Sequence, residues 1–142
     1  MNKLILLLSL TIFASLAALA DDKVTITIDI KGAQFGKGQI MCAIFDSKDS
    51  FLKDAAGEMT VQIDENNEAK CVFENMAKGE YAASAIYDLD NDGEMKTNFI
   101  GLPKEPVGMS NNHRPRFGPP KFKKAKETVN GDHVFNIEVE DA

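Results

Sequence analysis

Alternation of apolar and polar residues is the clearest pattern along this chain. Residues 23–31 place four aliphatic side chains on one face, with polar or charged side chains between them. This period of two predicts a half-buried β-strand. Residues 39–45 are apolar on both faces, as expected of a central strand that is covered on each side. Residues 58–64 alternate again, which predicts a third strand.

Further short strands complete the pattern. Residues 69–73 and 81–87 are largely apolar, and the segment 73–81 combines a strand end, an apolar residue, a glycine turn and a tyrosine. That turn resembles the one in transthyretin-like and related seven-stranded sandwich domains. Helical periodicity is weak, with at most a turn or two at residues 47–56. The sequence therefore predicts an all-β chain, an antiparallel Greek-key β-sandwich of about seven strands.

A hairpin is expected near the C-terminus. Residues 125–129 and 133–139 flank an Asn130-Gly131 pair, which is typical of hairpin turns. A three-residue loop at 130–132 keeps charged side chains off the apolar face, whereas a two-residue turn does not. We therefore expect the three-residue loop.

The segment 88–121 interrupts the alternation. All five prolines of the chain lie in it, together with several large apolar residues. The apolar residues are too many for a solvated linker, and irregular segments of this length inside a compact domain are usually functional or disordered. We expect one long ordered loop that lies across the sandwich.

The first twenty residues have the pattern of a secretory signal peptide. Lys3 provides the positive start, residues 4–13 a short apolar core, and Ala18-Leu19-Ala20 a cleavage site. The apolar core is too short to span a membrane. We expect cleavage near Ala20, a periplasmic or secreted location, and one domain over residues 21–142, which is not an integral membrane protein.

Charge and cysteine content agree with this location. Asp and Glu number 22 against 16 Lys and Arg, for a formal net charge of −6. Such an acidic balance disfavours nucleic-acid binding. Cys42 and Cys71 lie in predicted strands, and an exported protein can keep such a pair as a disulfide. The alternative is two buried thiols that do not meet.

An acidic motif follows the strand at 81–87. Asp88, Asp90 and Asp92 occupy alternate positions and Gly93 closes the run, an arrangement that favours a hard cation such as Ca²⁺. The alternative is a simple turn, since these residue types favour turns. Three crowded carboxylates repel one another, however, and need a cation or a basic partner.

The rest of the coordination shell must come from elsewhere. A helix-loop-helix calcium motif would place a bidentate Glu at the position of Phe99, and its flanking helices are also missing. That type of site is therefore excluded. The carbonyl of Glu94 and the side chains of Asn98 or Glu105 are the candidates to complete the shell. An ion held there would brace the long loop.

A basic run lies further along the same segment. Its members are His113, Arg114, Arg116, Lys121, Lys123, Lys124 and Lys126. One interpretation is a patch that binds an anion or an acidic partner. The other, which is favoured, is that the run is a solvated face or neutralises the acidic loop within the same molecule. The sequence shows no Ser or Cys nucleophile in a typical catalytic motif, such as a glycine-flanked serine, to act with His113 or His133. It also lacks a metal-ligand pair such as His-x-x-x-His, so enzymatic activity is unsupported.

Several short motifs, taken in order, resemble one family. They are residues 79–82, the acidic loop 88–93, residues 101–111, and residues 118–122 with Ala125. Together they resemble the exported bacterial domain-of-unknown-function family 2141, from about Val24 to Val139. The resemblance implies a small periplasmic or secreted β-sandwich of undefined role, with no catalytic residues to assign.

Three functions remain open. The first is a non-enzymatic binding or structural module of the cell envelope, whose cation-braced loop meets a protein or small-molecule partner. The second is a carrier of a small apolar ligand between the sheets, beside the alanine-rich strand at 82–85. The third is a small-molecule hydrolase that uses His113, Arg114 and Glu105 beneath the 88–121 loop.

Overall fold

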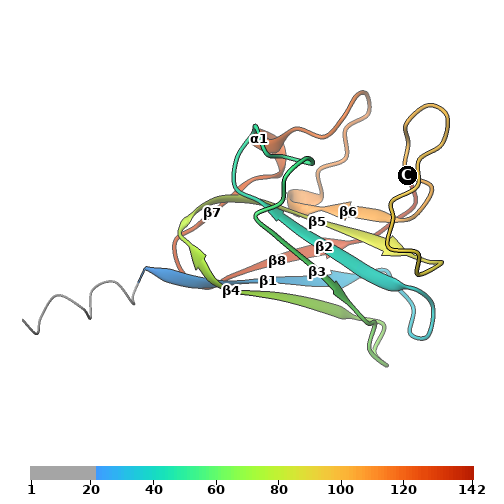
Figure 1. The fold of residues 1–142 in the computed structure, drawn as a ribbon, viewed down its shortest axis with the longest axis horizontal. Coiled ribbons are helices and arrows are strands. Elements are labelled where there is room, and N and C mark those ends of the chain that lie inside the picture. The colour runs from blue at the N-terminus through green and yellow to red at the C-terminus, as the bar shows by residue number, and fades with distance from the viewer. Residues whose placement is uncertain (1–21) are drawn as a thin grey trace, which may run out of the picture.

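The computed structural model describes residues 22–142, so the expected signal peptide lies outside the described residues. Over this range the chain forms two β-sheets with very little helix (Figure 1), which confirms the all-β prediction. The strands are β1 (Lys23–Lys31), β2 (Gln39–Phe45), β3 (Gly57–Val61), β4 (Ala69–Ala77), β5 (Gly79–Asp88), β6 (Val107–Met109), β7 (Glu127–Val129) and β8 (His133–Glu138). Two short helical elements, η1 (Ser110–Asn112) and α1 (Phe122–Ala125), lie between β6 and β7.

The strands divide into a smaller and a larger sheet. The smaller sheet has the order β4-β1-β8, and the larger has the order β3-β2-β5-β6, with β7 also paired to β5. All these pairs are antiparallel except β1 with β8, which runs parallel and sets Ile28 beside Phe135. The prediction of an entirely antiparallel sandwich is therefore wrong at this pair.

The predicted C-terminal hairpin is also wrong. β7 pairs with β5 and β8 pairs with β1, so the segment 130–132 crosses from the larger sheet to the smaller one. Neither Asn130 nor Gly131 has the positive φ that a type I′ hairpin turn requires at both central residues. Asp132 instead accepts a hydrogen bond of 2.9 Å from the backbone N–H of Thr25, which holds the crossing beside β1.

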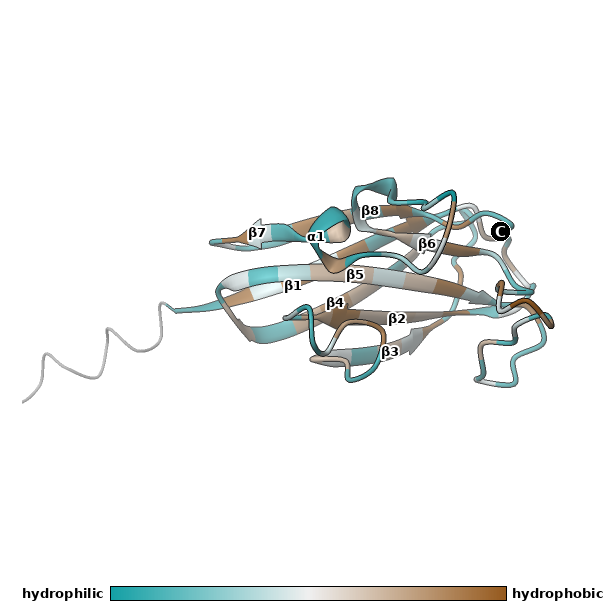
Figure 2. Cartoon of the chain, turned by 90° about the horizontal axis from the view of Figure 1, so that it is seen from above, coloured by the Kyte–Doolittle hydropathy of each residue, from teal (hydrophilic) through white to brown (hydrophobic). Residues whose placement is uncertain are grey.

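The core lies between the two sheets, and alternation along the strands builds it (Figure 2). The aliphatic residues of β1, namely Val24, Ile26, Ile28 and Ile30, are all buried. Full burial of such a side chain contributes about 1.5–3 kcal/mol. A disulfide between Cys42 of β2 and Cys71 of β4 links the two sheets through this core. Such a bond is compatible with an exported protein.

The segment 88–121 contains more regular structure than expected. A bridge between Thr97 and Pro103 closes a short hairpin, called here the 96–104 hairpin, whose stem includes a hydrogen bond from Lys104 N to Lys96 O. β6 then joins the edge of β5, so the segment is two loops on either side of a strand. In Figure 1 the gold-coloured hairpin extends from the end of the sandwich at which β5 finishes. No helix in residues 22–142 has the length and apolar character to cross a membrane.

A second apolar cluster covers the other face of the larger sheet. This outer cluster consists of Phe45, Phe51, Ala82, Phe122 and Ala125. The buried Ser110 ties it to β5, since its hydroxyl donates to Ala125 O at 2.6 Å and accepts from Ala83 N at 2.9 Å. The small side chains of β5 therefore allow α1 and η1 to approach the sheet closely.

Candidate metal centre

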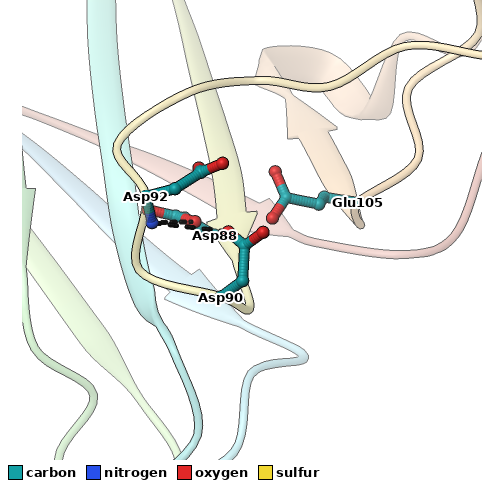
Figure 3. A group of neighbouring side chains, drawn as sticks. All are labelled: Asp88, Asp90, Asp92 and Glu105. Carbon is teal, nitrogen blue, oxygen red and sulfur yellow. Dashed lines mark hydrogen bonds between the residues drawn. The ribbon is translucent and has the colours of Figure 1, made fainter.

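Four carboxylates meet where β5 ends. Asp88 is the last residue of β5, Asp90 and Asp92 lie in the turn that follows, and Glu105 comes shortly before β6. One oxygen from each lies within 4.8 Å of the others (Figure 3). The fold thus brings together the three aspartates of the motif and one of the distant residues that the sequence nominated.

Asp88 anchors the turn from inside the protein. Its buried carboxylate accepts hydrogen bonds from the side chain of Gln39 at 2.8 Å, from Gly93 N at 2.9 Å and from Asp92 N at 3.3 Å. Burial acts to raise the pKa of Asp88, but these hydrogen bonds outweigh it and lower the pKa. Gly38 lies against the strand end, where a Cβ would stand 2.4 Å from Asp88 O. Asp88 is therefore ionised at neutral pH and fixed in place.

Glu105 is the opposite case. Its side chain is buried, Oε1 accepts a hydrogen bond of 3.1 Å from Leu89 N, and Oε2 has no hydrogen-bond partner among residues 22–142. Figure 3 shows the carboxylate directed toward Asp88 and Asp90. Burial raises the pKa of Glu105, and repulsion from the neighbouring aspartates adds to the rise. Among residues 22–142 no basic side chain forms an ion pair with Asp88 or Glu105.

Lys96 supplies positive charge on the exposed side. Its ammonium group forms ion pairs with Asp90 and with Asp92, the latter at 2.7 Å. The hydrogen bonds to these two aspartates raise the pKa of Lys96 above its ordinary value. All three side chains are partly exposed, so each ion pair contributes little to stability. Sequence reasoning missed this contact, because only the 96–104 hairpin returns Lys96 to the aspartates.

Two nominated ligands lie outside the group of four. The side chain of Glu94 is exposed, and the carbonyl of Glu94 as a ligand stays a prediction. The side-chain oxygen of Asn98 accepts hydrogen bonds of 3.0 Å from the backbone of Ile100 and of Leu102, so it shapes the tip of the hairpin. Its role as a ligand likewise stays a prediction.

Two members of the basic run form ion pairs with acids outside the acidic cluster. Arg114 contacts Glu140 at 2.9 Å, and Lys126 contacts Glu80 at 2.6 Å. Within residues 22–142 no member of the run forms an ion pair with the acidic cluster. Lys96, and not the basic run, pairs with the aspartates of the acidic loop.

The three residues of the hydrolase hypothesis have different partners. His113 accepts a hydrogen bond from Lys121 N at 3.2 Å, Arg114 pairs with the side-chain carboxylate of Glu140, and Glu105 faces the aspartates. His133, the other histidine, contacts Glu127 at 2.7 Å. These contacts give a hydrolase no support. The carrier hypothesis gains none either, because Ala83 and Ala85 are packed within the core.

Comparison with known protein families gives a match over most of the chain. A family model described as an uncharacterized protein conserved in bacteria (DUF2141) matches residues 28–137. The chain belongs to the DUF2141 family. No curated protein and no solved structure matches it. In this DUF2141 chain the matched range covers the acidic cluster, the basic run and most of both sheets, so the family assignment and the site concern the same domain.

Proposed function

We propose that this protein is a non-enzymatic binding module of the cell envelope, in which a divalent cation, Ca²⁺, holds the 96–104 hairpin to the sandwich. The observation that carries the proposal is Glu105, whose buried Oε2 has no partner and faces three aspartates. A buried polar atom without a partner costs about 1–3 kcal/mol, and more when the group is charged. A cation among the four carboxylates removes that cost.

Several features favour Ca²⁺ over Mg²⁺. Ca²⁺ accepts six to eight oxygen ligands in irregular geometry, whereas Mg²⁺ requires a nearly ideal octahedron and keeps several waters. The four carboxylates come from a strand end and two loop positions, an arrangement that suits the less demanding ion. Water and backbone carbonyls, with that of Glu94 as the first candidate, would fill the remaining positions.

The hairpin has a surface suited to binding a partner. At its tip Phe99 is 99% exposed and Ile100 is 65% exposed. Apolar side chains presented together to water are common at interaction sites, and a loop on a rigid sandwich is a common place for recognition. The cation would stabilise the base of the hairpin, and the tip would contact a protein or small-molecule partner.

Two further inferences accompany this proposal. The sandwich is of the Greek-key, transthyretin-like type, supported by the turn at which the Tyr81 hydroxyl donates to Ala77 O at 2.8 Å. The protein is periplasmic or secreted, supported by the Cys42–Cys71 disulfide.

Thermal unfolding with and without Ca²⁺ tests the cation site. A cation at one hundred times its Kd adds about 2.7 kcal/mol to the free energy of unfolding, so the melting temperature rises with Ca²⁺ and falls with a chelator. The double variant Asp90→Ala, Asp92→Ala loses this response. The matched control is Asp54→Ala with Glu65→Ala, two exposed acids elsewhere, and it keeps the response. If no divalent cation raises the melting temperature of the natural protein, the proposal is wrong.

A further inference from the structure

A groove that shares no residue with the acidic cluster is lined by residues of the 47–56 loop and of the segment 119–124. Its volume is about 740 Å³, within the range of roughly 300–1,000 Å³ that small-molecule sites occupy. Phe51 and Phe122 of the outer cluster line it, and their rings meet edge to face with centroids 5.7 Å apart. Pro119 and Pro120 line it as well, so the groove has a firm apolar wall.

Leu52 is held at this groove in an unusual conformation. Its φ is +59°, in the left-handed region, and its side chain is 45% exposed while it lines the groove. A leucine in that region is strained by about 1–2 kcal/mol, and such strain is concentrated at functional sites. The fold therefore places an apolar side chain at the groove at the expense of local stability.

Lysines provide all the charge along the groove. They are Lys48, Lys53, Lys121, Lys123 and Lys124. In the part of the chain that the structure describes, none of these five takes part in an ion pair. Asp49 and Asp54 belong to the same loop but do not line the groove. On a chain with a formal net charge of −6, five lysines beside one apolar groove form a local positive field.

We propose that this groove binds a fatty acid, with the alkyl chain against the aromatic and proline side chains and the carboxylate among the lysines. Apolar walls with a positive rim match a molecule that is apolar along its length and anionic at one end. An acidic peptide fits less well, because no residue of the groove lies in a β-strand, and an extended peptide therefore has no sheet edge to pair with.

Calorimetric titration with dodecanoate, below its micelle concentration, tests the proposal. Dodecyltrimethylammonium has the same chain with the opposite charge, acetate has the carboxylate without the chain, and an oligoglutamate peptide represents the acidic partner. We expect one dodecanoate per chain, bound at least about tenfold more tightly than the cationic analogue, which corresponds to about 1.4 kcal/mol. Acetate should show no saturable binding. The titration is repeated with a chelator present and should give the same result, which separates this site from the cation site.

Two variants examine the parts of the groove. Leu52→Gly removes an apolar wall at a position where glycine suits the backbone, so it weakens dodecanoate binding about fivefold to tenfold without lowering the melting temperature. Lys121→Gln with Lys123→Gln weakens the binding of dodecanoate and leaves that of the cationic analogue unchanged or tighter. The matched control, Lys23→Gln with Lys37→Gln, removes the same charge elsewhere and preserves binding.

Four results would overturn the proposal. They are absence of dodecanoate binding, equal affinity for the two oppositely charged amphiphiles, tighter binding of the oligoglutamate peptide, and full affinity in a folded Leu52→Gly variant.

Discussion

Replacing Glu105 by Gln should stabilise the protein when no divalent cation is present. Gln has the same shape, and its carbonyl oxygen can keep the hydrogen bond from Leu89 N. Its amide group would replace Oε2, the atom that is buried without a partner, and would donate toward the aspartate carboxylates. The substitution therefore replaces Oε2, an acceptor without a partner, with an amide N–H₂ group that can donate to the neighbouring carboxylates.

The magnitude follows from the burial of Glu105, a residue that is only 6% exposed. Relief of an unsatisfied buried polar atom is worth about 1–3 kcal/mol, and we expect a gain of about 1–2 kcal/mol in the chelated protein. For a domain of this size each kcal/mol raises the melting temperature by about 4 °C. The same substitution removes one of four anionic ligands, so the stabilisation by Ca²⁺ should largely disappear.

Thermal unfolding of the natural protein and of Glu105→Gln, each in chelator and in Ca²⁺, measures both effects. The expected result is a reversal of order, with the variant more stable in chelator and the natural protein more stable in Ca²⁺. Glu138→Gln, an exposed substitution with the same change of charge, should leave both melting temperatures nearly unchanged. A variant that is less stable in chelator, or that keeps the full Ca²⁺ response, would refute the reasoning about Oε2.

Two other predictions concern the fold. The disulfide joins residues 29 apart in sequence. On the chain-entropy model, the double variant Cys42→Ala, Cys71→Ala should therefore lose about 3–4 kcal/mol of unfolding free energy, as measured by urea unfolding. A loss below about 1 kcal/mol would contradict that model for this protein. Tyr81→Phe should cost about 1 kcal/mol at neutral pH by removing the hydrogen bond to Ala77 O. Burial, and secondarily the charge of Asp46, raises the pKa of Tyr81 above 10.0. The natural protein should therefore lose stability as the pH rises through that pKa. In unfolding measured from pH 8 to 11, the variant should lack the part of this loss that is due to Tyr81.

Local patterns predicted the strands well and their partners less well. Residues 23–31 alternate so regularly that only a half-buried strand suits them, and β1 has these bounds. The Asn130-Gly131 pair favoured a hairpin because the sequence alone shows turn preference and not the sheet to which each flanking strand belongs. The larger sheet had room for β7 beside β5, and β1 had a free edge for β8. Long-range pairing therefore overrode the local turn signal.

The acidic site shows the same division between local and distant information. Asp88, Asp90 and Asp92 lie close together in any compact turn, so their spacing was enough to predict the cluster. Glu105 could be nominated only among other candidates, since its place depends on how the chain returns from the 96–104 hairpin to β6. Its burial and its unpartnered oxygen had no sequence signal at all.

Lys96 sets a limit on how tightly the cluster can hold an external ion. The aspartates that would coordinate Ca²⁺ already contact the ammonium group, so the ion must displace a cation tethered by the same hairpin. The displaced contacts are exposed and worth little, whereas the buried carboxylates of Asp88 and Glu105 are beyond the ion pairs that Lys96 makes. The ion should therefore bind through all four carboxylates, and competition from Lys96 should lower its affinity only slightly. The buried carboxylates have no cationic partner in residues 22–142, and the exposed ones have only the weak ion pairs with Lys96. This arrangement favours an ion with a structural role over an ion that switches the fold.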